Sequence, residues 1–147
     1  MFRIKPPTIM VLAIVLLFLL ETYCPGPQLW HTPQTYGGVL PIVIGLGLLF
    51  VSLRSFHRQG TTSDPFDESA HLVTVGPYEY SRNPMYLGML LILVGCVILT
   101  GRVTPWLVPP LFAVILHHAF IKPEEARLAN RFGPIYHDYL KQVRRWI

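Results

Sequence analysis

Apolar residues along this chain gather into four runs, and polar residues fill the segments between them. The runs cover about residues 7–23, 37–53, 84–100 and 104–121. A transmembrane α-helix needs about 20 mostly apolar residues, with a lower limit of about 17, so each run is long enough to cross a bilayer. The pattern predicts an all-α integral membrane protein with four transmembrane helices.

Two short connections join these runs. Residues 24–36 are rich in proline and glycine and contain no lysine or arginine. Within them, Trp30 and Tyr36 suit the aromatic belt at a membrane interface. Residues 101–103 form so short a turn that the third and fourth helices must be antiparallel neighbours.

Glycine and proline give two of the helices particular features. Gly38, Gly45 and Gly47 give the second run a thin face that suits close packing of helices in lipid. We expect this face and the fourth helix to line the path of a lipophilic substrate. Pro109 and Pro110 are expected to kink the fourth helix.

Two longer polar segments remain, residues 54–83 and 122–147. The first is long for a connection inside a compact protein, and such loops are usually functional or disordered. The second has apolar residues at spacings of three or four, interrupted by Gly133 and Pro134. We expect it to form two short amphipathic helices that lie at the membrane surface with their apolar side inward.

The basic residues predict the side of the membrane on which these segments lie. Of the twelve lysines and arginines, only Arg102 falls on one side of the predicted bilayer. Because positive residues favour the cytoplasmic side, both termini, the long loop and the tail are predicted to be cytoplasmic. Topology and anionic lipid then explain the net charge of +4, and no nucleic-acid partner is expected.

Composition agrees with a membrane protein and limits the chemistry. The chain of 147 residues is 52% hydrophobic and 14% charged, whereas a soluble domain carries roughly 25% charged residues. This length favours a single domain over residues 1–147. Cys24 and Cys96 have no paired spacing and the histidines are scattered, so neither a disulfide framework nor a metal site is expected.

The long loop and the tail should meet near one membrane surface, because they flank the antiparallel third and fourth helices. The loop contains Tyr78 and Tyr80, Tyr86 follows at the start of the third run, and Glu124 and Glu125 lie near the start of the tail. This set suits a ligand with a flat ring, a positive charge and hydroxyl groups. Since there is no glycine-rich phosphate loop, a nucleoside without a pyrophosphate fits better than a dinucleotide.

Three stretches within about the last eighty residues carry a family resemblance. They are Val-Thr-Val-Gly-Pro-Tyr-Glu-Tyr-Ser-Arg-Asn-Pro-Met-Tyr-Leu-Gly at 73–88, Glu-Glu-Ala-Arg-Leu-Ala-Asn-Arg-Phe-Gly-Pro-Ile-Tyr-His-Asp-Tyr at 124–139, and Val-Arg-Arg-Trp at 143–146. In this order they resemble the isoprenylcysteine carboxyl methyltransferase family and the related phospholipid methyltransferases. The resemblance implies an integral membrane enzyme that binds S-adenosylmethionine at the cytoplasmic surface.

Carried over position by position, the resemblance implies a cofactor pocket made by the loop, the start of the third helix and the tail. The residues expected to bind the cofactor are His71, Leu72, Val73, Tyr78, Arg82, Asn83, Pro84, Tyr86 and Glu124. The first three would act largely through their backbone. The eukaryotic enzymes have histidine at the position of Asn83, and an asparagine can hydrogen-bond but cannot titrate.

Several of these residues also have a simpler structural interpretation. Glu124 and Glu125 follow Pro123 in what reads as the first turn of a helix, where the helix dipole alone favours carboxylates. Tyr86 also suits an interfacial belt, and Arg82 also suits a lipid headgroup.

The methyl acceptor is expected to be a lipophilic carboxylate, amine or thiol. His117 and His118 lie near the cytoplasmic end of the fourth run, where a histidine facing the bundle is a candidate for the substrate side. No residue can be assigned as a general base, and the oligomeric state is open. Two rival functions are an NADPH-dependent membrane reductase of the sterol-reductase type and a non-catalytic membrane subunit. The expected location is a bacterial inner membrane.

Overall fold

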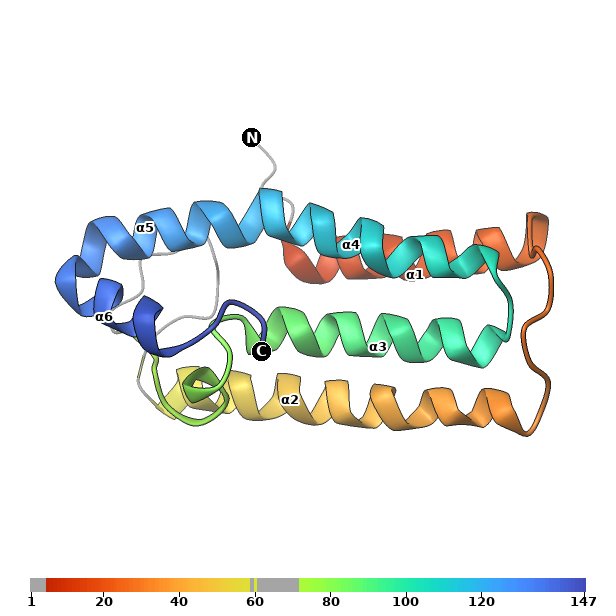
Figure 1. Ribbon diagram of the computed structural model, residues 1–147, viewed down its shortest axis with the longest axis horizontal. Helices are drawn as coiled ribbons and strands as arrows, with labels where there is room; N and C mark the ends of the chain where they lie inside the picture. The colour runs from red at the N-terminus through yellow and green to blue at the C-terminus, as the bar shows by residue number, and fades with distance from the viewer. Residues whose placement is uncertain (1–4, 59, 61–71) are drawn as a thin grey trace.

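The computed structural model describes residues 5–58, 60 and 72–147 and arranges them as helices that run side by side along one long axis (Figure 1). In chain order they are α1 Pro6–Tyr23, η1 Gln34–Gly38, α2 Val39–Arg58, η2 Gly76–Glu79, α3 Pro84–Thr100, η3 Thr104–Leu107, α4 Val108–Leu116, η4 His117–Ile121, α5 Lys122–Phe132 and α6 Pro134–Gln142. These ranges contain no β-strand, so the predicted all-α class is confirmed for the described part of the chain.

Three helical stretches are long and apolar enough to cross a membrane. They are Pro6–Tyr23, Gln34–Arg58 and Thr104–Phe132, while Pro84–Thr100 is apolar but shorter. This shorter helix, α3, lies at the centre of the bundle and contacts α1, α2 and α4. It coincides with the third run predicted over 84–100.

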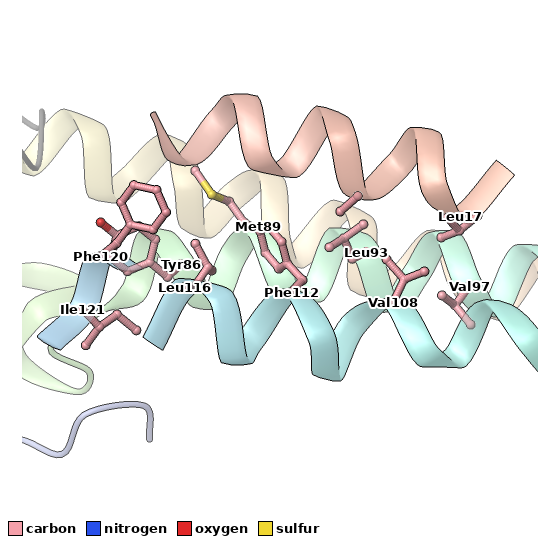
Figure 2. Close-up of a cluster of buried hydrophobic side chains, with 11 residues drawn as sticks. Leu17, Tyr86, Met89, Leu93, Val97, Val108, Phe112, Leu116, Phe120 and Ile121 are labelled. Atoms are coloured by element: carbon pink, nitrogen blue, oxygen red, sulfur yellow. The ribbon is translucent and has the colours of Figure 1, made fainter. Parts of the chain in front are cut away.

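The apolar core lies between α1, α3 and α4 (Figure 2). Leu17 of α1, Leu93 of α3, and Phe112 and Leu116 of α4 are all at most 2% exposed. On α2, by contrast, large apolar side chains such as that of Phe50 are exposed. Apolar residues on the outside are what a lipid-facing surface requires, because lipid tails solvate them as well as a protein core does.

Glycines bring α2 and α3 into close contact. A Cβ atom built on Gly45 would lie 2.5 Å from the Gly88 carbonyl oxygen, and one on Gly95 would lie 2.5 Å from that of Gly38. The predicted thin face is therefore confirmed for Gly45 in α2 and for Gly38, which ends η1 directly before α2. Gly47 was wrongly included, because nothing lies within 4 Å of its built Cβ. Since α3 covers the two packed glycines, this face cannot line a substrate path as expected.

The fourth predicted helix does not end at Ile121. It continues through the π-helical turn η4 into α5, so the chain is helical from Thr104 to Phe132, and α5 prolongs the line of α4 beyond the start of α3 (Figure 1). Pro123 explains the π-helical turn, because proline has no N–H and its ring clashes with the carbonyl four residues earlier. The expectation of two helices lying flat on the membrane is wrong for α5.

Two prolines also act differently from the prediction. Pro109 and Pro110 lie in the first turn of α4, directly after the 3-10 helix η3. The first turn of a helix tolerates proline because its N–H groups have no partner within the helix. These residues therefore begin α4 and do not kink the middle of a helix.

The end of the bundle opposite α5 is closed by the first connection. The Leu29 N–H donates to the Gly101 carbonyl at 2.7 Å, and the Trp30 indole N–H donates to the Ile98 carbonyl at 3.1 Å. The rings of Trp30 and Trp106 also meet edge to face. Tyr36 is 64% exposed, as an interfacial residue would be.

Candidate functional site

A hollow lies at the end of the bundle where α5 extends beyond α3. It is walled by the end of α2, the segment before α3, and helices α5 and α6. The lining residues are Phe56, Leu72, Val73, Tyr78, Arg82, Asn83, Glu124, Glu125, Leu128, Tyr136 and Tyr139. The loop and the tail, far apart in sequence, therefore meet as predicted.

A hydrogen bond joins the start of α3 to α5 beside this hollow. The Tyr86 hydroxyl donates to the Glu124 carboxylate at 3.0 Å. Tyr86 lies in the first turn of α3 and is also part of the apolar core, where it packs near Phe120 (Figure 2). The π-helical turn lets both Phe120 and Ile121 be buried before Glu124 faces the hollow, because it adds one residue to the turn.

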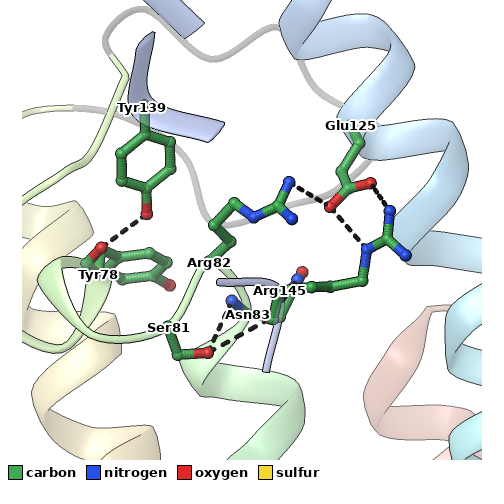
Figure 3. A network of polar contacts seen from close by, with 7 residues as sticks. All are labelled: Tyr78, Ser81, Arg82, Asn83, Glu125, Tyr139 and Arg145. Atoms are coloured by element: carbon green, nitrogen blue, oxygen red, sulfur yellow. Dashed lines mark hydrogen bonds and ion pairs between the residues drawn. The ribbon is translucent and has the colours of Figure 1, made fainter. Parts of the chain in front are cut away.

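Glu125 pairs with two arginines from different segments (Figure 3). One carboxylate oxygen lies 3.0 Å from Arg82 Nη1, and Arg145 donates from Nε at 3.0 Å and from Nη2 at 2.7 Å. This two-bond geometry fits an arginine fork to a carboxylate. The hydrogen bonds to Glu125 raise the pKa of Arg145 above its usual value, so this guanidinium stays charged at any ordinary pH.

The last residues of the chain, 143–147, are here called the C-terminal strap, and they pass along the segment before α3. The Arg82 N–H donates to the Arg144 carbonyl at 3.0 Å, and the Asn83 Nδ2 donates to the Arg145 carbonyl at 3.0 Å. Val143 is buried and Trp146 packs on the apolar core. The strap thus holds the backbone of Arg82 and the side chain of Asn83.

Aromatic side chains form the remaining wall. Tyr78 meets Phe56 edge to face with ring centroids 5.4 Å apart, and the Tyr139 hydroxyl donates to the Tyr78 carbonyl at 2.7 Å (Figure 3). Burial raises the pKa of Tyr78 and of Tyr139 well above the usual value. Burial, with the Glu125 charge, raises the pKa of Tyr136 to about 12. All three rings therefore present neutral hydroxyls at physiological pH.

Most of the predicted cofactor residues lie at this hollow. Leu72, Val73, Tyr78, Arg82, Asn83 and Glu124 line it. Tyr86 reaches it through Glu124, and Pro84 is buried in the first turn of α3 behind it. His71 lies outside the described residues.

Three other sequence predictions look different in the structure. Tyr80 is 79% exposed and does not line the hollow, so its inclusion among the aromatic faces was wrong. The Asn83 amide holds the C-terminal strap. His117 and His118, the candidates for the substrate side, lie in the π-helical turn with their rings edge to face at 5.0 Å and do not line the hollow.

Five residues that line the hollow were not among the predicted cofactor residues: Phe56, Glu125, Leu128, Tyr136 and Tyr139. Tyr136 and Tyr139 lie three residues apart, as neighbours on one face of a helix do, and this spacing was a usable signal. Phe56 sits at the end of an apolar run, where nothing in the sequence separates it from lipid-facing residues.

The family model for phospholipid methyltransferase matches residues 33–135. A cobalt-zinc-cadmium resistance protein, CzcN, from Cupriavidus metallidurans is 29% identical over 131 residues, which cover 88% of this chain and 58% of that protein. A protein-S-isoprenylcysteine O-methyltransferase from Schizosaccharomyces pombe is 39% identical over 75 residues, 49% of this chain and 30% of that protein.

The chain thus spans less than two thirds of the length of either relative. No solved structure matches it significantly. The family model and the yeast relative both carry the name methyltransferase, and the apolar helices indicate an integral membrane protein.

Proposed function

The chain belongs to the phospholipid methyltransferase family, and from this premise we propose that it is a membrane methyltransferase that uses S-adenosylmethionine to methylate a lipophilic acceptor. The observation that carries the proposal is the hydrogen bond between Tyr86 and Glu124. It joins the start of α3 to α5 and creates a polar hollow directly above an apolar core. A polar methyl donor and an apolar methyl acceptor can meet where a polar pocket borders an apolar core.

The residues of the hollow fit the proposed donor. Arg82 has a buried Nε with no hydrogen-bond partner in the described part of the chain, and an unpaired buried donor calls for an acceptor group. Glu124 can accept from ribose hydroxyls or lie against a positive charge, and the rings of Tyr78 and Tyr139 can pack on adenine. When bound, S-adenosylmethionine supplies a methyl group activated by the sulfonium.

The protein's own contribution is to orient the reactants and to exclude water. A hollow walled by the rings of Phe56, Tyr78, Tyr136 and Tyr139 limits water near Glu124. Alignment of the reacting atoms is the main demand of a displacement. The acceptor can be a carboxylate, an amine or a thiol. His117, half-buried in the π-helical turn, lies on the same continuous helix two turns before Glu124 and is a substrate-side residue in this proposal.

The proposed topology has four membrane spans, made by α1, α2, α3 and the stretch from η3 to η4. In the described part of the chain, Arg102 alone among the basic residues lies at the end closed by Trp30. The others lie directly before α1, at the end of α2, directly before α3, on α5 and α6, or on the C-terminal strap. By the positive-inside rule, the hollow and both termini then face the cytoplasm, and a bacterial inner membrane is the proposed location.

Binding of S-adenosylhomocysteine to the purified protein in detergent tests the proposal. We expect saturable binding, weakened about tenfold (1.4 kcal/mol) by Glu124→Gln and less by Tyr86→Phe. Tyr80→Phe is the matched control, because Tyr80 is exposed. Binding of NADPH in place of the nucleoside would favour a reductase. No binding of either would favour a non-catalytic subunit.

A further inference from the structure

Two adjacent carboxylates lie at the hollow in opposite surroundings. Glu125 is held by Arg82 at 3.0 Å and by two nitrogens of Arg145 (Figure 3). Glu124 accepts a hydrogen bond from the Tyr86 hydroxyl at 3.0 Å, and no arginine or lysine among the described residues forms an ion pair with it. Neighbouring acids whose surroundings differ in this way take different roles in proton transfer. The arginines keep Glu125 an anion, whereas Glu124 can exchange a proton.

Glu124 lies where the hollow borders the apolar core. Its partner Tyr86 belongs to that core, and so do Phe120 and Ile121, which are buried about one turn earlier on the same continuous helix (Figure 2). Glu125 pairs instead with the C-terminal strap. Of the two carboxylates, Glu124 is therefore the one that a group arriving from the apolar core reaches first.

The surroundings of Glu124 also make it a better base than an exposed glutamate. Burial raises the pKa of its carboxyl group above the usual value, and the hydrogen bond from Tyr86 offsets this only in part. A base works best when its pKa approaches the pH at which the protein works. The other titratable or charged groups that act on Glu124 in the described part of the chain are Arg127 and Glu125 on α5, Tyr78 on η2 and Tyr136 on α6.

We propose that Glu124 is the proton acceptor of the methyl-transfer step, and that the methyl acceptor is a lipophile whose attacking atom carries a proton, an amine or a thiol. The inference rests on the proposed function and deepens it, because it excludes a carboxylate acceptor. A carboxylate has no proton to give up, and the negative charge of Glu124 repels it.

The step balances as follows for either acceptor. Tyr86 holds one oxygen of Glu124, and the other oxygen takes the proton from the N–H or S–H group. The lone pair left on that nitrogen or sulfur bonds to the methyl carbon. The bond from the methyl carbon to the sulfonium breaks, and its electron pair stays on sulfur as a neutral thioether. Glu124 then returns its proton to water.

A spectroscopic titration tests the proton-binding role without any methyl acceptor. Infrared difference spectra of the full chain in detergent are recorded across pH, and the band of a protonated carboxyl group is assigned to Glu124 by its loss in Glu124→Gln. We expect this band to persist to higher pH than that of an exposed glutamate. Tyr86→Phe should move the titration to still higher pH, because the carboxylate loses a donor.

Two controls belong to this titration. Glu125→Gln should leave the band present, because Glu125 is paired with Arg82 and Arg145. Tyr80→Phe should not shift the band, because Tyr80 is exposed and lies outside the hollow. Titration of Glu124 at the pH of an exposed glutamate, about 4.3, would overturn the proposal.

Transfer of a labelled methyl group to three probes of equal chain length identifies the acceptor chemistry. Dodecylamine, dodecanethiol and dodecanoic acid are each offered with saturating S-adenosylmethionine, so that weaker donor binding does not contribute. We expect label on the amine or the thiol and none on the acid. Glu124→Gln should lower kcat about a hundredfold, as loss of a general base does. Glu124→Asp, which keeps a carboxylate, should recover part of this loss.

The pH dependence of the rate gives a further check. The wild-type kcat should rise with pH through the titration of Glu124, because only the ionised carboxylate can take a proton, and this rise should be absent in Glu124→Gln. Methylation of dodecanoic acid by the wild type would overturn the proposal, and so would an unchanged kcat in Glu124→Gln. If none of the probes is methylated, the infrared titration decides alone. If the unmodified protein binds no S-adenosylhomocysteine, the proposed function itself fails, whatever the titration shows.

Discussion

The contact between α2 and α3 and the cluster around Glu125 hold the same protein together by opposite means. Between the helices, the decisive residues have no side chain, and backbone meets backbone at Gly45 and Gly88. Around Glu125, long charged side chains from α5, the segment before α3 and the C-terminal strap meet at one carboxylate. The first contact should be sensitive to added volume and the second to lost charge.

The largest effect is expected from volume added between α2 and α3. Gly45→Leu should destabilise the protein by about 3 kcal/mol or more, because its Cβ alone would overlap the Gly88 carbonyl oxygen. Gly47→Leu is the control on the same helix, since nothing lies near that position. Thermal unfolding in detergent measures both. Equal melting temperatures for the two variants would mean that α2 and α3 do not pack through these glycines.

The next effect is expected from charge removed at the polar end. Glu125→Ala leaves Arg82 and Arg145 without their shared partner, and we expect a loss of about 2 kcal/mol, less than for a fully buried pair because Arg145 is partly exposed. Glu125→Gln, which keeps the shape and one acceptor oxygen, should cost less. If both variants unfold at the wild-type temperature, the cluster contributes nothing to stability.

A smaller effect should follow loss of one neutral hydrogen bond. Tyr139→Phe removes the donor to the Tyr78 carbonyl and should cost about 1 kcal/mol. It should also loosen the aromatic wall of the hollow. Tyr80→Phe removes an exposed hydroxyl and serves as the control. A wild-type melting temperature for Tyr139→Phe would show that α6 is not held to the loop by this bond.

The smallest effect is expected at an exposed ion pair on α6. Asp138 and Lys141 are 2.8 Å apart, but their side chains are 66% and 76% exposed. Solvent and salt screen such pairs. We therefore expect Asp138→Asn to have the same melting temperature as the wild type at every salt concentration. A clear drop in the melting temperature would mean that surface charge, as well as the cluster around Glu125, stabilises the end of the bundle near the hollow.

Much of the fold followed from the sequence because hydrophobic patterning is local. An apolar run bounded by Pro84 and Gly101 specifies a helix whatever surrounds it, and α3 has the predicted bounds. The short turn after it made α3 and α4 antiparallel, which was enough to bring Tyr86 and Glu124 together. Pro123 led to the wrong prediction that the fourth helix ends at Ile121, because proline usually marks the start of a helix. Here a π-helical turn accommodates Pro123 inside a longer helix.

By itself, the sequence determined the apolar helices, the all-α class and the end of the bundle where polar residues collect, because each depends on composition and spacing along a single segment. Only the tertiary structure decided that Glu125 is shared by Arg82 and Arg145, and that Tyr139 reaches the Tyr78 carbonyl. Those contacts join residues between 20 and 61 positions apart in the sequence, and two of the three lie across the helix reversal at Gly133. They depend on where α6 and the C-terminal strap fold back, and no local pattern encodes that direction.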